Sequence, residues 1–345
     1  MTRRAAVLRA VPAILLFALP AVGLLGLAAL SLTIGRYPVS VPDIVAILSG
    51  HDGGMAPARR AVLRAILIQA RLPRIVGAVV VGAALSASGA GYQAVFRNPL
   101  VSPGLLGVLA GAGFGAALGI VAGAGPAGIH VLSFLGGVLA VAAGAGIARL
   151  FDVRSMLMLV FGGLLSTAFF TALLSALKYV ADPDRQLPDI VFWLLGSLTQ
   201  VGWRDLMVAA PPVLGGIAVL TACGRMLDAL AMGDDEARTL GVPVGLLRHG
   251  VIAVASMLAA LTVSVAGMIG WIGLMVPHAA RLLAGPRNGL VLPLSACLGG
   301  AFLLLCDDLA RVLTEQEVPV GLIVDLLSVC LFVGVLRLVR RGWAE

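Results

Sequence analysis

The chain has 345 residues, of which 60% are hydrophobic and only 12% are charged. Soluble globular domains carry about 25% charged residues, so this composition excludes an ordinary soluble protein and indicates that lipid is the solvent. The net charge of +7 comes from basic residues scattered through the polar loops, with no dense basic stripe and no interleaved aromatics. Loop charges of this kind set the orientation of a membrane protein, and we expect no nucleic-acid partner.

Continuous apolar runs of about 20 residues, the length at which a helix crosses a bilayer, follow one another along the chain. Transmembrane barrel strands would instead alternate apolar and polar residues over about ten positions. The 44 glycines suit closely packed membrane helices. The sequence therefore predicts an all-α integral membrane protein in one transmembrane domain, 1–345, with spans at about 11–34, 62–92, 104–124, 130–149, 156–178, 205–223, 249–270, 272–284, 289–306 and 319–339.

Two polar segments, 179–204 and 224–248, interrupt this succession of spans. The first contains Phe192-Trp-Leu-Leu-Gly-Ser197, which is typical of an interfacial turn with an aromatic anchor. The second contains Gly233-Asp-Asp-Glu-Ala-Arg-Thr-Leu-Gly241, the longest polar helical stretch between two spans. With ten spans both chain ends lie on one side, which we expect to be the cytoplasm. The arginines between 59 and 74 then lie outside, against the usual excess of positive charge inside.

A faint internal repeat is visible in the spacing of glycine and proline. Gly89 and Pro99 are ten residues apart, as are Gly267 and Pro277, and 178 residues separate the two pairs. Because the third and the eighth span start on opposite sides, this spacing predicts an inverted repeat, a common arrangement in transporters. The first repeat covers about 62–178 and the second about 249–340, with the segment 224–248 before the second.

Few residues could carry chemistry. The sequence has no phosphate-binding Gly-x-x-x-x-Gly-Lys-Ser/Thr loop and no His-Glu-x-x-His motif, so we expect no catalytic residue, no metal site and no bound cofactor. Asp307-Asp308 with Arg311 fits a metal or diphosphate site, or an acidic helix end paired with an arginine one turn on, and the spacing favours the pairing. Asp325 lies inside an apolar run, where an acid is costly, so it faces either a wet pathway or a structural partner.

Six motifs, in fixed order across nearly the whole chain, resemble one known family. They are Arg71-Leu-Pro-Arg74 with Gly82, Leu85, Ser88-Gly89, Gln93 and Asn98-Pro-Leu-Val-Ser-Pro-Gly-Leu-Leu-Gly107; Phe192 to Ser197; Gly233 to Gly241; Gly273-Leu-Met-Val-Pro-His278 with Arg281; Asp307 with Arg311; and Glu317-Val-Pro-Val-Gly321. The chain is similar to the membrane subunits of type II ABC importers for iron–siderophore complexes, haem and cobalamin, the FecCD-like permeases.

The resemblance implies a type II ABC importer permease fold of ten helices with an inverted repeat. It also implies a homodimer with the pathway on its two-fold axis, two ATPase subunits that hold ATP and Mg²⁺, and a periplasmic binding protein, all at the bacterial inner membrane. By their match to the family, Arg71, Arg74 and Arg311 receive acidic residues of the binding protein. For Arg71 and Arg74 the alternative is snorkelling to lipid headgroups.

The same match assigns residues to force coupling and to the pathway. The polar segment is expected to form the coupling helix that fits the ATPase, with acidic residues in its first turn, where they suit the helix dipole. Its residues are Gly233, Asp234, Asp235, Glu236, Ala237, Leu240 and Gly241. The pathway candidates are Gln93, Asn98, Asp325 and Ser328.

The sequence departs from the family's pattern at two places. Trp271-Ile272 stands where a Phe is usual, and in the last span Val324, Ser328 and Cys330 replace a Thr, Gly and Pro pattern, with Asp325 added. That span lines the pathway in relatives, so the identity of the transported substrate does not follow from the resemblance. We expect an iron chelate, siderophore or haem, with cobalamin as the alternative.

Two other classes of protein compete with an importer permease. The first is an ion-coupled secondary transporter in which Asp307, Asp308 or Asp325 titrates, and it needs no ATPase partner. The second is a membrane-embedded transferase built on Asp307-Asp308.

Overall fold

The computed structural model describes residues 13–50, 55–151 and 156–341, and within these ranges the regular secondary structure is helical. Six helices are long and apolar enough to cross a membrane, and four shorter apolar helices accompany them at the places of the predicted spans. The long ones are the continuous helix Pro57–Phe96, α7 (Pro126–Leu150), α8 (Met156–Val180), α10 (Trp203–Ala222), α13 (Val244–Ala266) and α15 (Asn288–Val312). The shorter apolar stretches are Leu15–Ser31 in α2 (Ala13–Ser31), Val108–Val121 (α6), Ile272–Ala284 (α14) and Val320–Gly334 in α16 (Val320–Arg341). The prediction of an all-α membrane protein is confirmed.

Short helices join these elements. They are α3 (Val41–Ser49), η2 (Pro103–Leu106), α9 (Gln186–Leu194), α11 (Gly224–Met232) and α12 (Asp234–Thr239). The helix α9 falls in the predicted interfacial segment, and α12 falls in the predicted polar segment. The two chain ends, 1–12 and 342–345, lie outside the described residues.

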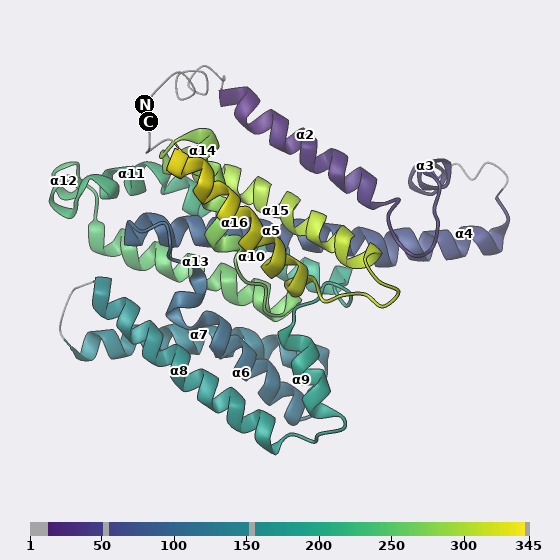
Figure 1. Cartoon of the computed structure of the whole chain (residues 1–345), viewed down its shortest axis with the longest axis horizontal. Helices are drawn as coiled ribbons and strands as arrows, with labels where there is room; N and C mark the ends of the chain where they lie inside the picture. Colours follow the sequence, from purple (N-terminus) through teal and green to yellow (C-terminus); the bar gives the residue numbers. More distant parts are fainter. Residues whose placement is uncertain (1–12, 51–54, 152–155, 342–345) are drawn as a thin grey trace.

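The helix Pro57–Phe96 is twice as long as a span needs to be. It comprises α4 (Pro57–Arg64), the π-helical stretch η1 (Ala65–Arg71) and α5 (Leu72–Phe96), and its 40 residues extend about 60 Å. The N–H of Leu72 bonds to the carbonyl of Leu67, five residues back. This wide turn directly precedes Pro73, whose ring lacks an N–H and would crowd a normal helical carbonyl. As a result α4 projects well beyond the other helices (Figure 1).

The bundle is built around α5. In Figure 1 the group α6 to α9 lies on one side of α5 and α13, and α2, α15 and α16 lie on the other. Glycines allow the close approach of these helices, as expected: Gly82 of α5 faces the backbone of Gly299 in α15. A side chain on Gly89 would overlap the carbonyl of Gly273, so α5 and α14 touch backbone to backbone there.

The two ends of the bundle are defined by contacts of α15. At its start, the N–H of Asn288 donates to Asp228 of α11 at 2.7 Å. Near its other end, Asp308 accepts a hydrogen bond of 2.6 Å from Ser31, the last residue of α2. The helices α11 and α12 therefore lie at the same end as the start of α2 and the end of α16, and α3 and α4 lie at the opposite end (Figure 1).

The residue pairs behind the predicted repeat occupy unlike settings. Gly89 lies inside α5 and Pro99 in the turn after it, whereas Gly267 ends α13 and Pro277 lies inside α14. These two pairs therefore do not mark equivalent positions. The repeats at about 62–178 and 249–340 remain a prediction.

Candidate functional site

The polar segment forms the short helix α12, which is tied to the bundle by one carboxylate. Gly233, the N-cap residue directly before it, has a φ of +144°, a conformation that side-chain-bearing residues rarely adopt. Asp234 Oδ1 accepts hydrogen bonds from Arg97 at 3.0 Å and from Arg248 at 2.5 Å. Burial raises the pKa of the Asp234 carboxyl, but the hydrogen bond and charge of Arg248 and the charge of Arg97 outweigh it, so its pKa lies below the usual value.

The other residues of this segment divide between an anchored face and an exposed face. Ala237 is fully buried, and its carbonyl accepts from the N–H of Val242, which closes the helix. Within the described part of the chain, Asp235 pairs only with Arg238 of the same helix, at 2.7 Å, and its side chain is almost fully exposed. Leu240 is 63% exposed. The segment therefore offers an apolar side chain and surface charges to a partner while its other face is fixed.

The three arginines predicted to dock a partner lie together at the opposite end of the bundle, and each has partners within the chain. Arg71 is buried and donates to the carbonyls of Leu32 and Tyr37. Arg74 donates through Nε to Asp307 Oδ1 at 2.9 Å and through Nη1 to Glu317 at 2.7 Å.

Arg311 completes this cluster. It contacts Asp308 at 2.5 Å and Asp307 at 3.1 Å, and it donates to Ser31 Oγ at 2.7 Å. The predicted pairing of Asp308 with Arg311 one turn on is therefore confirmed. Arg74 and Arg311 contact all three acids, and Arg71 contacts backbone carbonyls, so the cluster holds three arginines and three acids and the charge of Arg71 and Arg74 is locally balanced. The docking role of Arg71, Arg74 and Arg311 stays a prediction.

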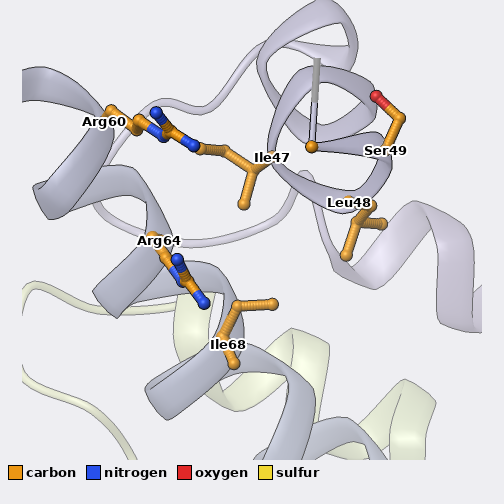
Figure 2. A pocket seen from close by; sticks show the side chains of 7 residues that line it. Ile47, Leu48, Ser49, Arg60, Arg64 and Ile68 are labelled. Atoms are coloured by element: carbon orange, nitrogen blue, oxygen red, sulfur yellow. The ribbon is translucent and has the colours of Figure 1, made fainter. Parts of the chain in front are cut away.

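Arginines that are not part of this cluster reach the surface at the same end of the bundle. Arg60 and Arg64 of α4 border a cavity of about 320 Å³ between α4 and α3. Figure 2 shows the Arg60 side chain directed toward Ile47 of α3 and the Arg64 side chain beside Ile68. Arg64 is exposed. Sequence analysis did not single out these two side chains, because the match to the family pointed to the arginines that follow.

The four predicted pathway residues do not share one surface. Gln93 is buried between α5 and α14, where it accepts from Arg281 and donates to the carbonyl of Leu274 at 3.1 Å. Asn98 is exposed and accepts from the N–H of Leu100 at 2.9 Å. Ser328 is fully buried, whereas Asp325 is exposed on α16. Of the two residues on α16, only Asp325 presents its side chain to the surroundings.

A family model, curated relatives and a solved structure all match the chain, and all of them are transport proteins. A family model described as the FecCD transport family matches residues 23–338. A molybdate import system permease protein of Haemophilus influenzae is 38% identical over 319 residues, which is 92% of this chain and 94% of the relative. A cobalamin import system permease protein of Halobacterium salinarum is 39% identical over 271 residues, which is 77% of this chain and 72% of the relative.

A solved structure extends this likeness to three dimensions. A metal-chelate type ABC transporter in an inward-facing conformation matches with a TM-score of 0.84 and 36% identity. The match covers 94% of this chain and 98% of that chain. Further relatives are named as iron-chelate and hemin permeases.

Proposed function

Because the chain belongs to the FecCD transport family, we propose that it is the permease subunit of an ABC importer that moves an iron chelate, siderophore or haem, from periplasm to cytoplasm. Members of this family are transport permeases and not enzymes, and ATP is hydrolysed on a separate subunit of such importers. The chain is a multi-pass membrane protein. We assign it to the bacterial inner membrane, with both termini and α12 in the cytoplasm.

The observation that carries this proposal is the attachment of α12. A six-residue polar helix is fixed to α5 through Arg97 and to α13 through Arg248, while Leu240 and Asp235 face outward. An ATPase subunit that grips the outward face would pull directly on two membrane helices. Interaction energy that differs between two states of the partner can shift the permease between its own states.

The partners follow from the two ends of the bundle. Two copies of the chain form the conduit between them, and two ATPase subunits with ATP and Mg²⁺ bind at the α12 end. A periplasmic binding protein docks at the end that carries α3 and α4, where Arg64 is exposed above the cluster of Arg71, Arg74 and Arg311. Acidic side chains on the binding protein would be guided by this basic surface.

The choice of an iron chelate as the transported substrate is supported by the names of the relatives and by the solved metal-chelate transporter. A second candidate is an oxyanion, because the relative from Haemophilus influenzae that aligns over most of this chain is named as a molybdate permease.

Uptake into proteoliposomes tests the proposal. We expect vesicles that contain the chain, its ATPase subunit and its binding protein to accumulate a ⁵⁵Fe-labelled chelate only with ATP. Accumulation without the ATPase subunit would instead support a secondary transporter. ATP-dependent uptake of molybdate but not of the chelate would support the oxyanion.

A further inference from the structure

Asp325 is an acid on the outer surface of a membrane-spanning helix. It is exposed on α16, in a stripe otherwise made of Leu322, Leu326 and Val329, which are also exposed. Among the described residues, no hydrogen bond or ion pair satisfies its carboxylate. A charged carboxylate inside the bilayer faces water or a partner and not hydrocarbon, because lipid gives it no solvation. This face of α16 therefore borders water or a second protein chain, and not lipid.

An irregular stretch of backbone lies against the same carboxylate. Between α13 and α14, residues 267–271 are not helical, and Asp325 Oδ1 lies 3.3 Å from the position that a Cβ on Gly270 would occupy. Non-helical backbone at membrane depth is tolerated only where it is buried in protein or lines water. A cavity of about 340 Å³ reaches the first residue of this stretch, Gly267.

Trp271, the next residue along, has a strained backbone. Its φ of +57° lies in the left-handed region that a bulky residue rarely adopts, and its side chain is 42% exposed. Such strain persists only where the surrounding structure holds it, and it concentrates at functional sites. Trp271 and Asp325 are both departures from the family's pattern, and Asp325 lies against Gly270, the residue that directly precedes Trp271.

We propose that Asp325 and Trp271 form an acidic and aromatic contact for the transported substrate on the wall of the conduit. This inference rests on the proposed importer function and adds a substrate class to it. The carboxylate and the face of the indole both attract cations, and in a two-fold homodimer each is present twice. The contact favours a cationic or neutral metal chelate and repels an oxyanion.

Charged thiol reagents test the wet surface and its sign. Val329 lies one helical turn from Asp325 on the same exposed stripe, so we place a reporter there with Val329→Cys in a Cys330→Ser background. Reaction rates are measured with a trimethylammonium-ethyl and a sulfonatoethyl methanethiosulfonate in proteoliposomes that contain the complete complex. The Cys330→Ser variant alone gives the background from the other cysteines.

We expect both reagents to modify the Val329→Cys reporter. The ratio of the cationic to the anionic reaction rate should be several-fold higher in this reporter protein than in the same protein with Asp325→Asn added. Asp325→Glu should keep the high ratio. Absence of reaction, which would mean that this face contacts lipid, overturns the proposal, and so does a ratio that Asp325→Asn leaves unchanged.

A second readout separates this inference from the proposed function. Stimulation of ATP hydrolysis by the binding protein is measured in the same vesicles. Normal stimulation with an unchanged reagent ratio rejects the substrate contact and leaves the importer intact. Absence of any stimulation in the unmodified protein counts against the importer itself.

Discussion

Arg97, the residue that ends α5, donates to Asp234, the first residue of α12, with 3.0 Å between Nη2 and Oδ1. The same oxygen accepts from Arg248 of α13 at 2.5 Å. One carboxylate therefore joins a surface helix to two helices of the bundle, one of which is the central helix α5. A displacement of α12 cannot occur without moving α5 and α13 or breaking these ion pairs.

Removing the charge of Asp234 should loosen coupling without unfolding the protein. Asp234→Asn weakens two partly exposed ion pairs, a loss of about 1 kcal/mol, which corresponds to about a fivefold change in an equilibrium. We expect import per ATP hydrolysed to fall by about that factor. The measurement compares substrate uptake with phosphate release in the same proteoliposomes.

Asp235→Asn is the matched control for this experiment. Asp235 is the next residue along and pairs only with Arg238 within α12. Because Asp235 faces the ATPase, Asp235→Asn should weaken association with the ATPase but leave import per ATP hydrolysed near the level of the unmodified protein. Equal losses in the two variants would indicate contact of both acids with the ATPase and not a link to α5.

The pH dependence of this link follows from the lowered pKa of Asp234. A folded-state pKa below the unfolded value of about 3.9 means that the carboxylate stabilises the fold above that pH. This contribution is lost as the pH falls through the folded pKa. We expect the difference in Tm between the unmodified protein and Asp234→Asn to be constant from about pH 8 to about pH 5 and to shrink only below about pH 4. A difference that already shrinks near neutral pH would contradict the assignment.

Much of the architecture was predictable because apolar run length decides where helices span a membrane. The family resemblance, which rested on motifs spread along the chain, is also confirmed. The helix that contains α5 begins at Pro57 and not near 62, because Arg59 and Arg60 break the apolar pattern but not the helix. The pairing of Asp308 with Arg311 was accessible from spacing alone.

The contacts of Arg74 show what the sequence could not reveal. Its partners Asp307 and Glu317 lie 233 and 243 positions away, so no local pattern connects them. The match to the family predicted that the Arg74 side chain is exposed to a docking partner. Its actual burial depends on how α5 and α15 pack, which the sequence does not reveal. For the same reason the closeness of Asp325 to Gly270 was invisible before the fold was known.

The arginine cluster should be sensitive to the loss of its most buried acid. Asp307 is fully buried between Arg74 and Arg311, so Asp307→Asn leaves the cluster with one more positive than negative charge, and we expect it to cost up to about 3–5 kcal/mol. Glu317→Gln, at the partly exposed edge, should cost about 1 kcal/mol or less. Unfolding of the purified proteins in detergent measures both.

A double variant tests whether this loss arises from charge imbalance. Arg74→Gln together with Asp307→Asn restores neutrality, so it should be less destabilised than the sum of the two single variants, by about 0.5–3 kcal/mol. Simple additivity would show that the cluster does not act through its charges.

Docking of the binding protein can be separated from folding by comparing two arginines. Arg64 is exposed, so Arg64→Glu should keep the Tm and weaken association several-fold at low salt, with a smaller effect at high salt, where exposed charges are screened. Arg71 is buried against backbone carbonyls, so Arg71→Glu should lower the Tm and the yield of folded protein. If Arg71→Gln and Arg74→Gln keep the Tm but abolish association, the cluster itself is the docking site.

The contact of α5 with α14 should tolerate no side chain at Gly89. A Cβ there would overlap the carbonyl of Gly273, which belongs to rigid helix backbone, so Gly89→Ala must push the two helices apart. Overpacking of this kind costs about 1–3 kcal/mol. Gly91 lies two residues along in the same helix, and the nearest atoms to a Cβ there belong to the side chains of Val251 and Leu220, at 3.4–3.5 Å. We expect Gly91→Ala to keep the Tm and Gly89→Ala to lower it, and equal Tm values would show that α14 is not held against α5 at this point.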